Sequence, residues 1–177
     1  MSETKNAIGK ILFTEEQIKE RAEELGKEIT EAYRGEELVL IGTLKGAIIW
    51  MADIMKRIDL DTQIDFITAS SYGGRTSTSG IVKITKDVEL DLTDKHVLIV
   101  EDIVDSGVTL SRLIEYLKER NAKSVKICTL LDKPSRRITD VKPDYVGFEV
   151  EDLFIIGYGL DYDQKYRNLP YISYLEQ

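Results

Sequence analysis

The run Val97-Leu98-Ile99-Val100 is the feature of the sequence that most constrains the fold. A run of four consecutive apolar residues that begins and ends with valine is typical of a strand that is buried on both faces. The stretch from Thr109 to Arg120 follows and is predicted to be a helix. A buried strand followed by a helix is the unit from which parallel sheets are built, so this pair predicts an α/β protein.

The rest of the chain repeats this alternation of strands and helices. Thr14-Glu15-Glu16-Gln17 has the form of a capping box, and apolar residues recur after it at helical spacing. Helices are predicted over 15–33, 46–58 and 109–120, and strands over 38–41, 63–69, 81–85, 97–100, 125–131, 145–148 and 154–157, with 81–85 as a hairpin arm. No internal repeat or linker divides these elements. We therefore expect a single domain over residues 1–177, built on a mainly parallel sheet flanked by helices.

Size and charge limit what the chain can do. A chain of 177 residues buries roughly 70% of its surface on folding, which is enough for a core without disulfides. Its 24 basic and 32 acidic residues give a net charge of −8. Sequence-independent binding to nucleic acid needs a basic face that displaces counterions, so nucleic acid is not expected as a partner.

Cysteine content and apolar patterning exclude further classes. Cys128 is the only cysteine, so an intrachain disulfide and a thiolate metal cluster are both excluded. It lies in an apolar run, where a buried small hydrophobic residue is expected rather than a nucleophile. Residues 1–10 carry charges without the apolar core of a signal peptide. The longest apolar stretch, 46–52, is far shorter than the roughly 20 residues that span a bilayer. We expect a cytoplasmic protein without a membrane partner.

Two adjacent carboxylates follow the strand over 97–100. In open α/β sheets ligands bind at the carboxyl ends of the strands, here the residues after Ile41, Val100, Leu131 and Ile156. Glu101 and Asp102 have no basic neighbour in sequence. Such a pair suits a divalent cation or the paired hydroxyls of a sugar, because both want anionic oxygen acceptors.

The next segment, Asp105-Ser106-Gly107-Val108-Thr109, predicts a phosphate cradle. It turns at a glycine and opens a helix, so its backbone N–H groups and its two hydroxyls lie at the positive end of the helix dipole. It has neither the glycine-lysine pattern of a P-loop nor the three glycines of a dinucleotide site. The alternative is that Asp105 or Ser106 only caps the helix.

These residues resemble a known family. The stretch Val97 to Leu110, VLIVEDIVDSGVTL, is similar to the phosphoribosyl-diphosphate (PRPP) signature of the type I phosphoribosyltransferases. The remaining chain resembles the hypoxanthine-guanine branch of bacterial size, in the order LKG at 44–46, SY at 71–72, LDKP at 131–134, KPDYVGF at 142–148, FIIGYGLDY at 154–162 and YRNLP at 166–170. The resemblance covers nearly the whole chain. It implies a type I fold with a small hood formed by the N- and C-terminal segments and a mobile loop.

The resemblance implies transfer of ribose 5-phosphate from PRPP to a purine, with release of pyrophosphate. Glu101 and Asp102 would hold the ribose hydroxyls, directly or through Mg²⁺, and Asp161 would lie near a second Mg²⁺. Asp105, Ser106, Gly107, Val108 and Thr109 would wrap the 5-phosphate. Asp105 also matches the general base near the purine N7, where a carboxylate can accept a proton.

Other matched positions face the base and the pyrophosphate. Lys133 matches the lysine that donates to the 6-oxo oxygen and so selects hypoxanthine and guanine over adenine. Phe154 matches the aromatic that stacks on the purine, although by itself it would be read as core packing, and Ile155 would offer backbone groups. Lys45, Gly46 and Arg167 match pyrophosphate contacts.

The family often has a cis peptide bond without proline before the lysine that matches Lys45. The polar segment 70–80, with Ser71 and Tyr72, resembles the mobile lid that keeps water from the sugar cation. A merely flexible hairpin tip is the alternative. A homodimer or homotetramer is also implied.

Three functions are compatible with these residues. The first is a purine salvage enzyme that makes IMP and GMP with Mg²⁺. The second is a phosphoribosyltransferase for another base such as xanthine. The third is a regulator that keeps the PRPP motif but binds RNA, against which the acidic composition and the intact Asp105 both argue.

Overall fold

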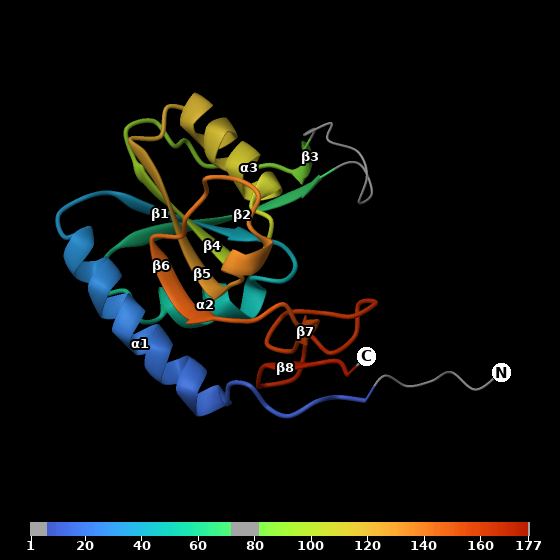
Figure 1. Cartoon of the computed structure of the whole chain (residues 1–177). Coiled ribbons are helices and arrows are strands. Elements are labelled where there is room, and N and C mark those ends of the chain that lie inside the picture. Colours follow the sequence, from blue (N-terminus) through green and yellow to red (C-terminus); the bar gives the residue numbers. More distant parts are fainter. Residues whose placement is uncertain (1–6, 72–81, 177) are drawn as a thin grey trace.

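A mostly parallel sheet of six strands forms the centre of the protein (Figure 1). The computed structural model describes residues 7–71 and 82–176. The strands of this sheet are, in chain order, β1 (Leu38–Thr43), β2 (Thr62–Ser71), β3 (Val82–Lys86), β4 (His96–Val104), β5 (Ser124–Asp132) and β6 (Tyr145–Glu149). They lie in the order β3-β2-β1-β4-β5-β6, in which β3 is antiparallel to β2 and every other neighbouring pair is parallel. The predicted α/β fold is confirmed, and so is the hairpin arm.

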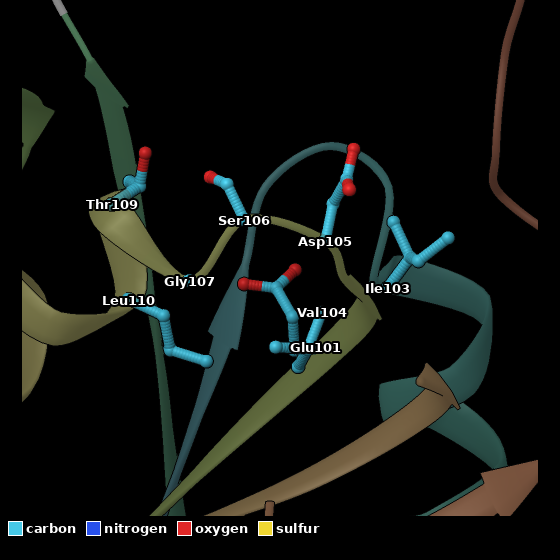
Figure 2. Close-up of a pocket in the computed structure, with 8 residues that line it drawn as sticks. All are labelled: Glu101, Ile103, Val104, Asp105, Ser106, Gly107, Thr109 and Leu110. Carbon is cyan, nitrogen blue, oxygen red and sulfur yellow. The ribbon is translucent and has the colours of Figure 1, made fainter. Parts of the chain in front are cut away.

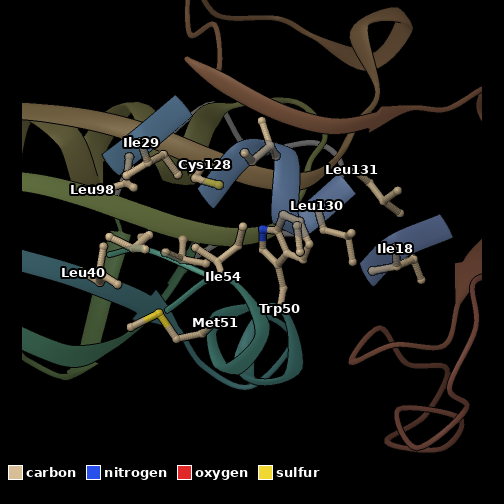
Figure 3. Close-up of a cluster of buried hydrophobic side chains, with 14 of the residues drawn as sticks. Ile18, Ile29, Leu40, Trp50, Met51, Ile54, Leu98, Cys128, Leu130 and Leu131 are labelled. Atoms are coloured by element: carbon tan, nitrogen blue, oxygen red, sulfur yellow. The ribbon is translucent and has the colours of Figure 1, made fainter. Parts of the chain in front are cut away.

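Helices cover both faces of the sheet. Helices α1 (Glu15–Ala32) and α2 (Ile48–Met55) lie on one face, and α3 (Val108–Glu119) lies on the other (Figure 1). Side chains of β1 alternate between them: Leu38 and Leu40 join the core cluster of α1 and α2, whereas Val39 and Ile41 join that of α3. Figure 3 shows the first cluster, with Trp50 of α2 among the strand residues. The continuous apolar runs are therefore explained by burial on both faces.

The capping box at the start of α1 forms as predicted. The Thr14 hydroxyl accepts from the Gln17 backbone N–H at 3.3 Å, and the Gln17 side chain accepts from the Thr14 backbone N–H at 2.9 Å. These bonds satisfy two of the donors that every helix N-terminus leaves free. The face with Ile18 and Leu25 then packs onto the sheet.

Strand β4 is longer than the predicted 97–100, and this changes where the two carboxylates lie. Because β4 stays paired with β5 up to Val104 and Asp132, Glu101 and Asp102 lie within the strand rather than after it. Alternation along a strand then sends their side chains to opposite faces. By this alternation Glu101 follows Ile99, which packs on the α3 side, and Asp102 follows Val100, which packs on the α1 and α2 side, while at this end of the strand both carboxylates line one cavity.

The strand predicted over 154–157 does not belong to the central sheet. Only β7 (Ile155–Ile156) forms there, and it pairs with β8 (Ser173–Tyr174) in a separate two-stranded sheet. Bridges from Ile8 to Leu175 and from Phe13 to Ile172 bring the N-terminal segment alongside this sheet (Figure 1). The two residues of β8 carry no local pattern, so they form a strand only through pairing that the fold brings about.

Other boundaries shift by a few residues. The helix predicted over 46–58 is confined to α2, preceded by a turn over 44–47. Cys128 is fully buried, as expected. None of the helices in the described part of the chain combines the length and the apolar character needed to cross a bilayer.

Candidate active site

The loop from β4 to α3 forms a concave, glycine-dependent turn, which we call the phosphate cradle (residues 105–109). Gly107 precedes α3 with φ +82°, a left-handed conformation that favours glycine. A Cβ there would also lie 2.3 Å from the Thr139 hydroxyl oxygen. The cradle borders a cavity of about 130 Å³, and Figure 2 shows Asp105, Ser106 and Thr109 extending from the loop above Glu101.

The backbone of the cradle leaves donors available. Among the described residues, no hydrogen bond uses the backbone N–H groups of Ser106, Gly107 or Thr109. Gly107 occupies the N-cap position of α3 and has no side chain to cap it, while the Ser106 hydroxyl oxygen accepts from the Val108 backbone N–H at 3.4 Å. Free N–H groups at a helix N-terminus are suited to an anion such as a phosphate.

Glu101 lies under the cradle in a strongly perturbed environment. Its carboxyl Oε1 accepts from the Thr43 hydroxyl at 2.5 Å and from the Asp102 backbone N–H at 3.0 Å. Loss of hydration and the neighbouring Asp102 carboxylate raise the pKa of Glu101 well above its usual range. A buried carboxyl beside a second carboxylate marks a candidate functional position.

Asp102 lies against the turn after β1. A Cβ on Gly46 would be only 1.7 Å from the Asp102 Oδ2 atom, so only a glycine lets the turn approach this carboxylate. The Leu44–Lys45 peptide bond is cis, as is frequent in the family that the sequence resembles. The Lys45 ammonium donates to the Gln164 side chain at 3.2 Å.

The C-terminal loop closes the other side of this turn. Arg167 is paired with Asp161 at 3.0 Å and donates to the Gly159 carbonyl at 2.7 Å. Gly159, with φ +102°, packs directly on the Gly46 carbonyl. Gly46, Asp161 and Arg167 line a cavity of about 240 Å³, together with Thr43, Glu101 and Asp102.

A third, larger cavity of about 470 Å³ opens beside Asp105. Lys133 is 7% exposed, and its ammonium donates to the Leu153 carbonyl at 2.9 Å and lies 3.5 Å from the Asp152 carboxylate. Phe154 is 45% exposed and packs edge-on against Tyr162. The core-packing alternative for Phe154 is therefore wrong, and the cavity presents one aromatic face and one buried cation.

The fold brings most of the predicted site residues together around these three cavities. The set is Gly46, Glu101, Asp102, Asp105, Ser106, Gly107, Thr109, Lys133, Phe154, Ile155, Asp161 and Arg167. Lys45 neighbours the set through Gln164, and Val108 is the first residue of α3. Ser71 ends β2, whereas Tyr72 and most of the predicted lid over 70–80 lie outside the described residues.

The predicted metal ligands do not form a closed cage. Glu101, Asp102 and Asp161 border one cavity, yet no group of three carboxylate, histidine or cysteine side chains converges on a point in the described ranges. Mg²⁺ commonly takes one or two carboxylates and completes its shell with water and substrate oxygens. The residues present fit an ion of that kind.

Several contributors were missed by the sequence analysis. Thr43 bonds to Glu101, Arg136 lies 3.4 Å from the Asp105 carboxylate, and Gly159 packs on the turn after β1. Arg136 could have been noticed, because it follows Lys133 closely in the sequence. The other two act across more than 50 residues of chain, and nothing local marks them.

Comparisons with known proteins agree with this geometry. A family model described as a phosphoribosyl transferase domain matches residues 10–163. A hypoxanthine-guanine phosphoribosyltransferase of Bacillus subtilis is 52% identical over 172 residues, 97% of this chain and 96% of the relative. A hypoxanthine phosphoribosyltransferase of Escherichia coli is 50% identical over 165 residues, 92% of this chain and 93% of the relative. The crystal structure of a Staphylococcus aureus hypoxanthine phosphoribosyltransferase superposes with a TM-score of 0.93 at 47% identity, covering 97% of this chain and 93% of that one.

Proposed function

This chain belongs to the phosphoribosyl transferase family, and we propose that it transfers the 5-phosphoribosyl group of PRPP to hypoxanthine or guanine, forming IMP or GMP and pyrophosphate. The observation that carries the choice of substrate is the buried Lys133 ammonium in the cavity next to Asp105. The reaction is a step of purine salvage.

The phosphate cradle binds the 5-phosphate of PRPP in this proposal. Its free N–H groups and the hydroxyls of Ser106 and Thr109 offer neutral donors to a dianion. The cradle, with Val108 as its first helical residue, fixes one end of the ribose. Glu101 and Asp102 then receive the ribose hydroxyls, one from each face of β4.

Lys133 and Phe154 select the base. The Lys133 ammonium donates to the 6-oxo oxygen, while Phe154 stacks on the ring and Ile155 offers backbone groups to its edge. Adenine carries a 6-amino group, which cannot accept from an ammonium. The buried donor therefore discriminates against adenine more strongly than an exposed lysine would.

Asp105 accepts the proton that the purine N7 loses during transfer. It borders both the cradle and the base cavity, so its carboxylate lies between the phosphate and the base. The Arg136 Nε atom lies 3.4 Å from this carboxylate, on the side of the base cavity. A carboxylate at this position acts as a general base.

Pyrophosphate leaves from the turn after β1. Lys45, the backbone at Gly46, and Arg167 supply its contacts. Glu101, Asp102 and Asp161 would hold Mg²⁺, which neutralises charge on the departing pyrophosphate when it is bound. We predict that the segment with Ser71 and Tyr72 encloses the site. This enclosure protects the sugar cation from water.

The architecture around the site is part of the proposal. One domain spans residues 1–177, and the N-terminal segment joins β7 and β8 as a hood. A homo-oligomer is supported by Ile48 and Met55, two exposed apolar residues two helical turns apart on α2. The cytoplasmic location and the lack of a nucleic-acid partner stay predictions.

The test is a panel of bases offered with PRPP and Mg²⁺. We expect nucleotide formation with hypoxanthine and guanine, less with xanthine, and none with adenine or uracil. Failure with both hypoxanthine and guanine would overturn the proposal. Efficient turnover of xanthine alone would assign a different base, and RNA binding at physiological salt without transferase activity would support the regulator.

A further inference from the structure

The segment that follows β5 takes up the carbonyl oxygens of the phosphate cradle and of the residue before it. The Lys133 backbone N–H donates to the Val104 carbonyl at 3.0 Å, and the Ile138 backbone N–H donates to the Ser106 carbonyl at 3.0 Å. Between them, the Arg137 Nε atom donates to the Asp105 carbonyl at 2.9 Å. The Val104, Asp105 and Ser106 carbonyls therefore accept hydrogen bonds from donors that do not line the cavity of the cradle.

Arg137 is the one side chain in this set that contacts several parts of the loop. Its guanidinium also donates to the Val104 carbonyl at 3.4 Å and to the Val141 carbonyl, and it forms an ion pair with Asp132 at the end of β5. The two side chains are only 13% and 14% exposed. Its Cδ atom also lies 3.0 Å from the place where a Cβ on Gly107 would be, so the stem packs behind the cradle.

This arrangement has a direct consequence for phosphate binding. A peptide loop can present N–H groups to an anion only if its carbonyl dipoles point elsewhere, because a carbonyl oxygen facing a phosphate repels it. The guanidinium supplies the donor that holds the Asp105 carbonyl away and a second donor to the Val104 carbonyl, and Asp132 neutralises its charge within the protein. Arg137 itself does not line the cavity of the cradle.

We infer that Arg137, oriented by Asp132, is a positioning residue that keeps the phosphate cradle in its phosphate-binding conformation. The inference rests on the proposed function, because it assumes that the cradle takes the 5-phosphate. An arginine is needed for this role: its planar fork reaches three carbonyls and a carboxylate at once, whereas a lysine has a single nitrogen.

The test compares ligands that differ only in the 5-phosphate. Binding of IMP and of inosine is measured by calorimetry for the wild-type protein, Arg137→Lys, and the control Arg34→Lys at an exposed residue in the turn after α1. We expect Arg137→Lys to weaken IMP about 10- to 100-fold, as expected for the loss of buried hydrogen bonds, with inosine unchanged. The control should change neither ligand.

A second variant guards against misfolding. In the double variant Asp132→Leu with Arg137→Met, no buried charge is left unpaired, yet the Asp105 carbonyl still loses the donor that Arg137 supplies. The same selective loss of IMP affinity is expected there, with the thermal unfolding midpoint measured alongside.

Equal weakening of IMP and inosine, or no change in either, would overturn the inference and leave Arg137 a general structural residue. A wild-type protein that neither binds IMP nor forms it from PRPP would overturn the proposed function and this inference with it. The wild-type measurement alone identifies that case.

Discussion

Gly46 and Asp102 are in such close contact that a Cβ on Gly46 would lie 1.7 Å from the Asp102 Oδ2 atom. Glycine at this position lets the turn after β1 and the carboxylate on β4 share one cavity. The contact couples the groups proposed to bind pyrophosphate to those proposed to bind ribose and Mg²⁺.

Gly46→Ala should therefore damage activity. The added methyl group displaces the Asp102 carboxylate, so we expect kcat/KM for PRPP to fall at least about 100-fold, in line with the effect of small misplacements in a site. Steady-state kinetics with varied PRPP measures this. Gly35→Ala is the matched control: Gly35 has φ +81° but nothing within 4 Å of its would-be Cβ. It should cost about 1 kcal/mol of stability and leave activity intact. Full activity in Gly46→Ala would contradict the proposed role of this contact.

Asp105→Asn should separate chemistry from binding. An amide of nearly the same shape cannot take the N7 proton, so we expect the rate of nucleotide formation to fall about 10²- to 10⁴-fold. Affinity for PRPP should change little, because the backbone of the cradle is retained. Single-turnover kinetics and PRPP binding report the two effects separately. An unchanged rate would remove the general-base role.

Lys133→Ala should act on the base. Loss of a buried ammonium that donates to the 6-oxo oxygen is expected to weaken purine binding by about 1.5–3 kcal/mol and to reduce discrimination against adenine. KM values for hypoxanthine and adenine at saturating PRPP measure this. Lys126→Ala, at a residue on β5 outside the three cavities, serves as the control. If only PRPP binding changed, Lys133 would have been assigned wrongly.

Cys128 should be inert in the folded protein. Burial raises the pKa of its thiol to about 12, so the nucleophilic thiolate is scarcely present at pH 8. We expect no reaction with a thiol reagent at pH 8 in native buffer, and one equivalent of thiol to react after unfolding in guanidinium. Rapid modification of the native protein would show that the thiol is accessible.

Much of the fold can be predicted from local patterns in the amino-acid sequence. Continuous apolar runs such as 97–100 predicted buried strands, and the capping box at Thr14 predicted the start of α1, because strand burial and helix capping depend on neighbouring residues. The cradle over 105–109 was also predictable, since its glycine, its hydroxyls and the following helix are contiguous. The residues matched to the family were found in the same way, as short ordered motifs.

What only the tertiary structure decided depends on residues far apart in the chain. Pairing with β5 carries β4 past Glu101 and Asp102 and so places them on opposite faces, and β8 forms only by pairing with β7. The approach of Gly46 to Asp102, and of Arg137 to the carbonyls of the cradle, are packing contacts between separate segments. Sequence by itself determined most of the elements that form and the glycine turn that opens α3. The tertiary fold determined how the carboxylates, the turn after β1 and the segment behind the cradle meet, because such contacts arise only when the whole sheet has assembled.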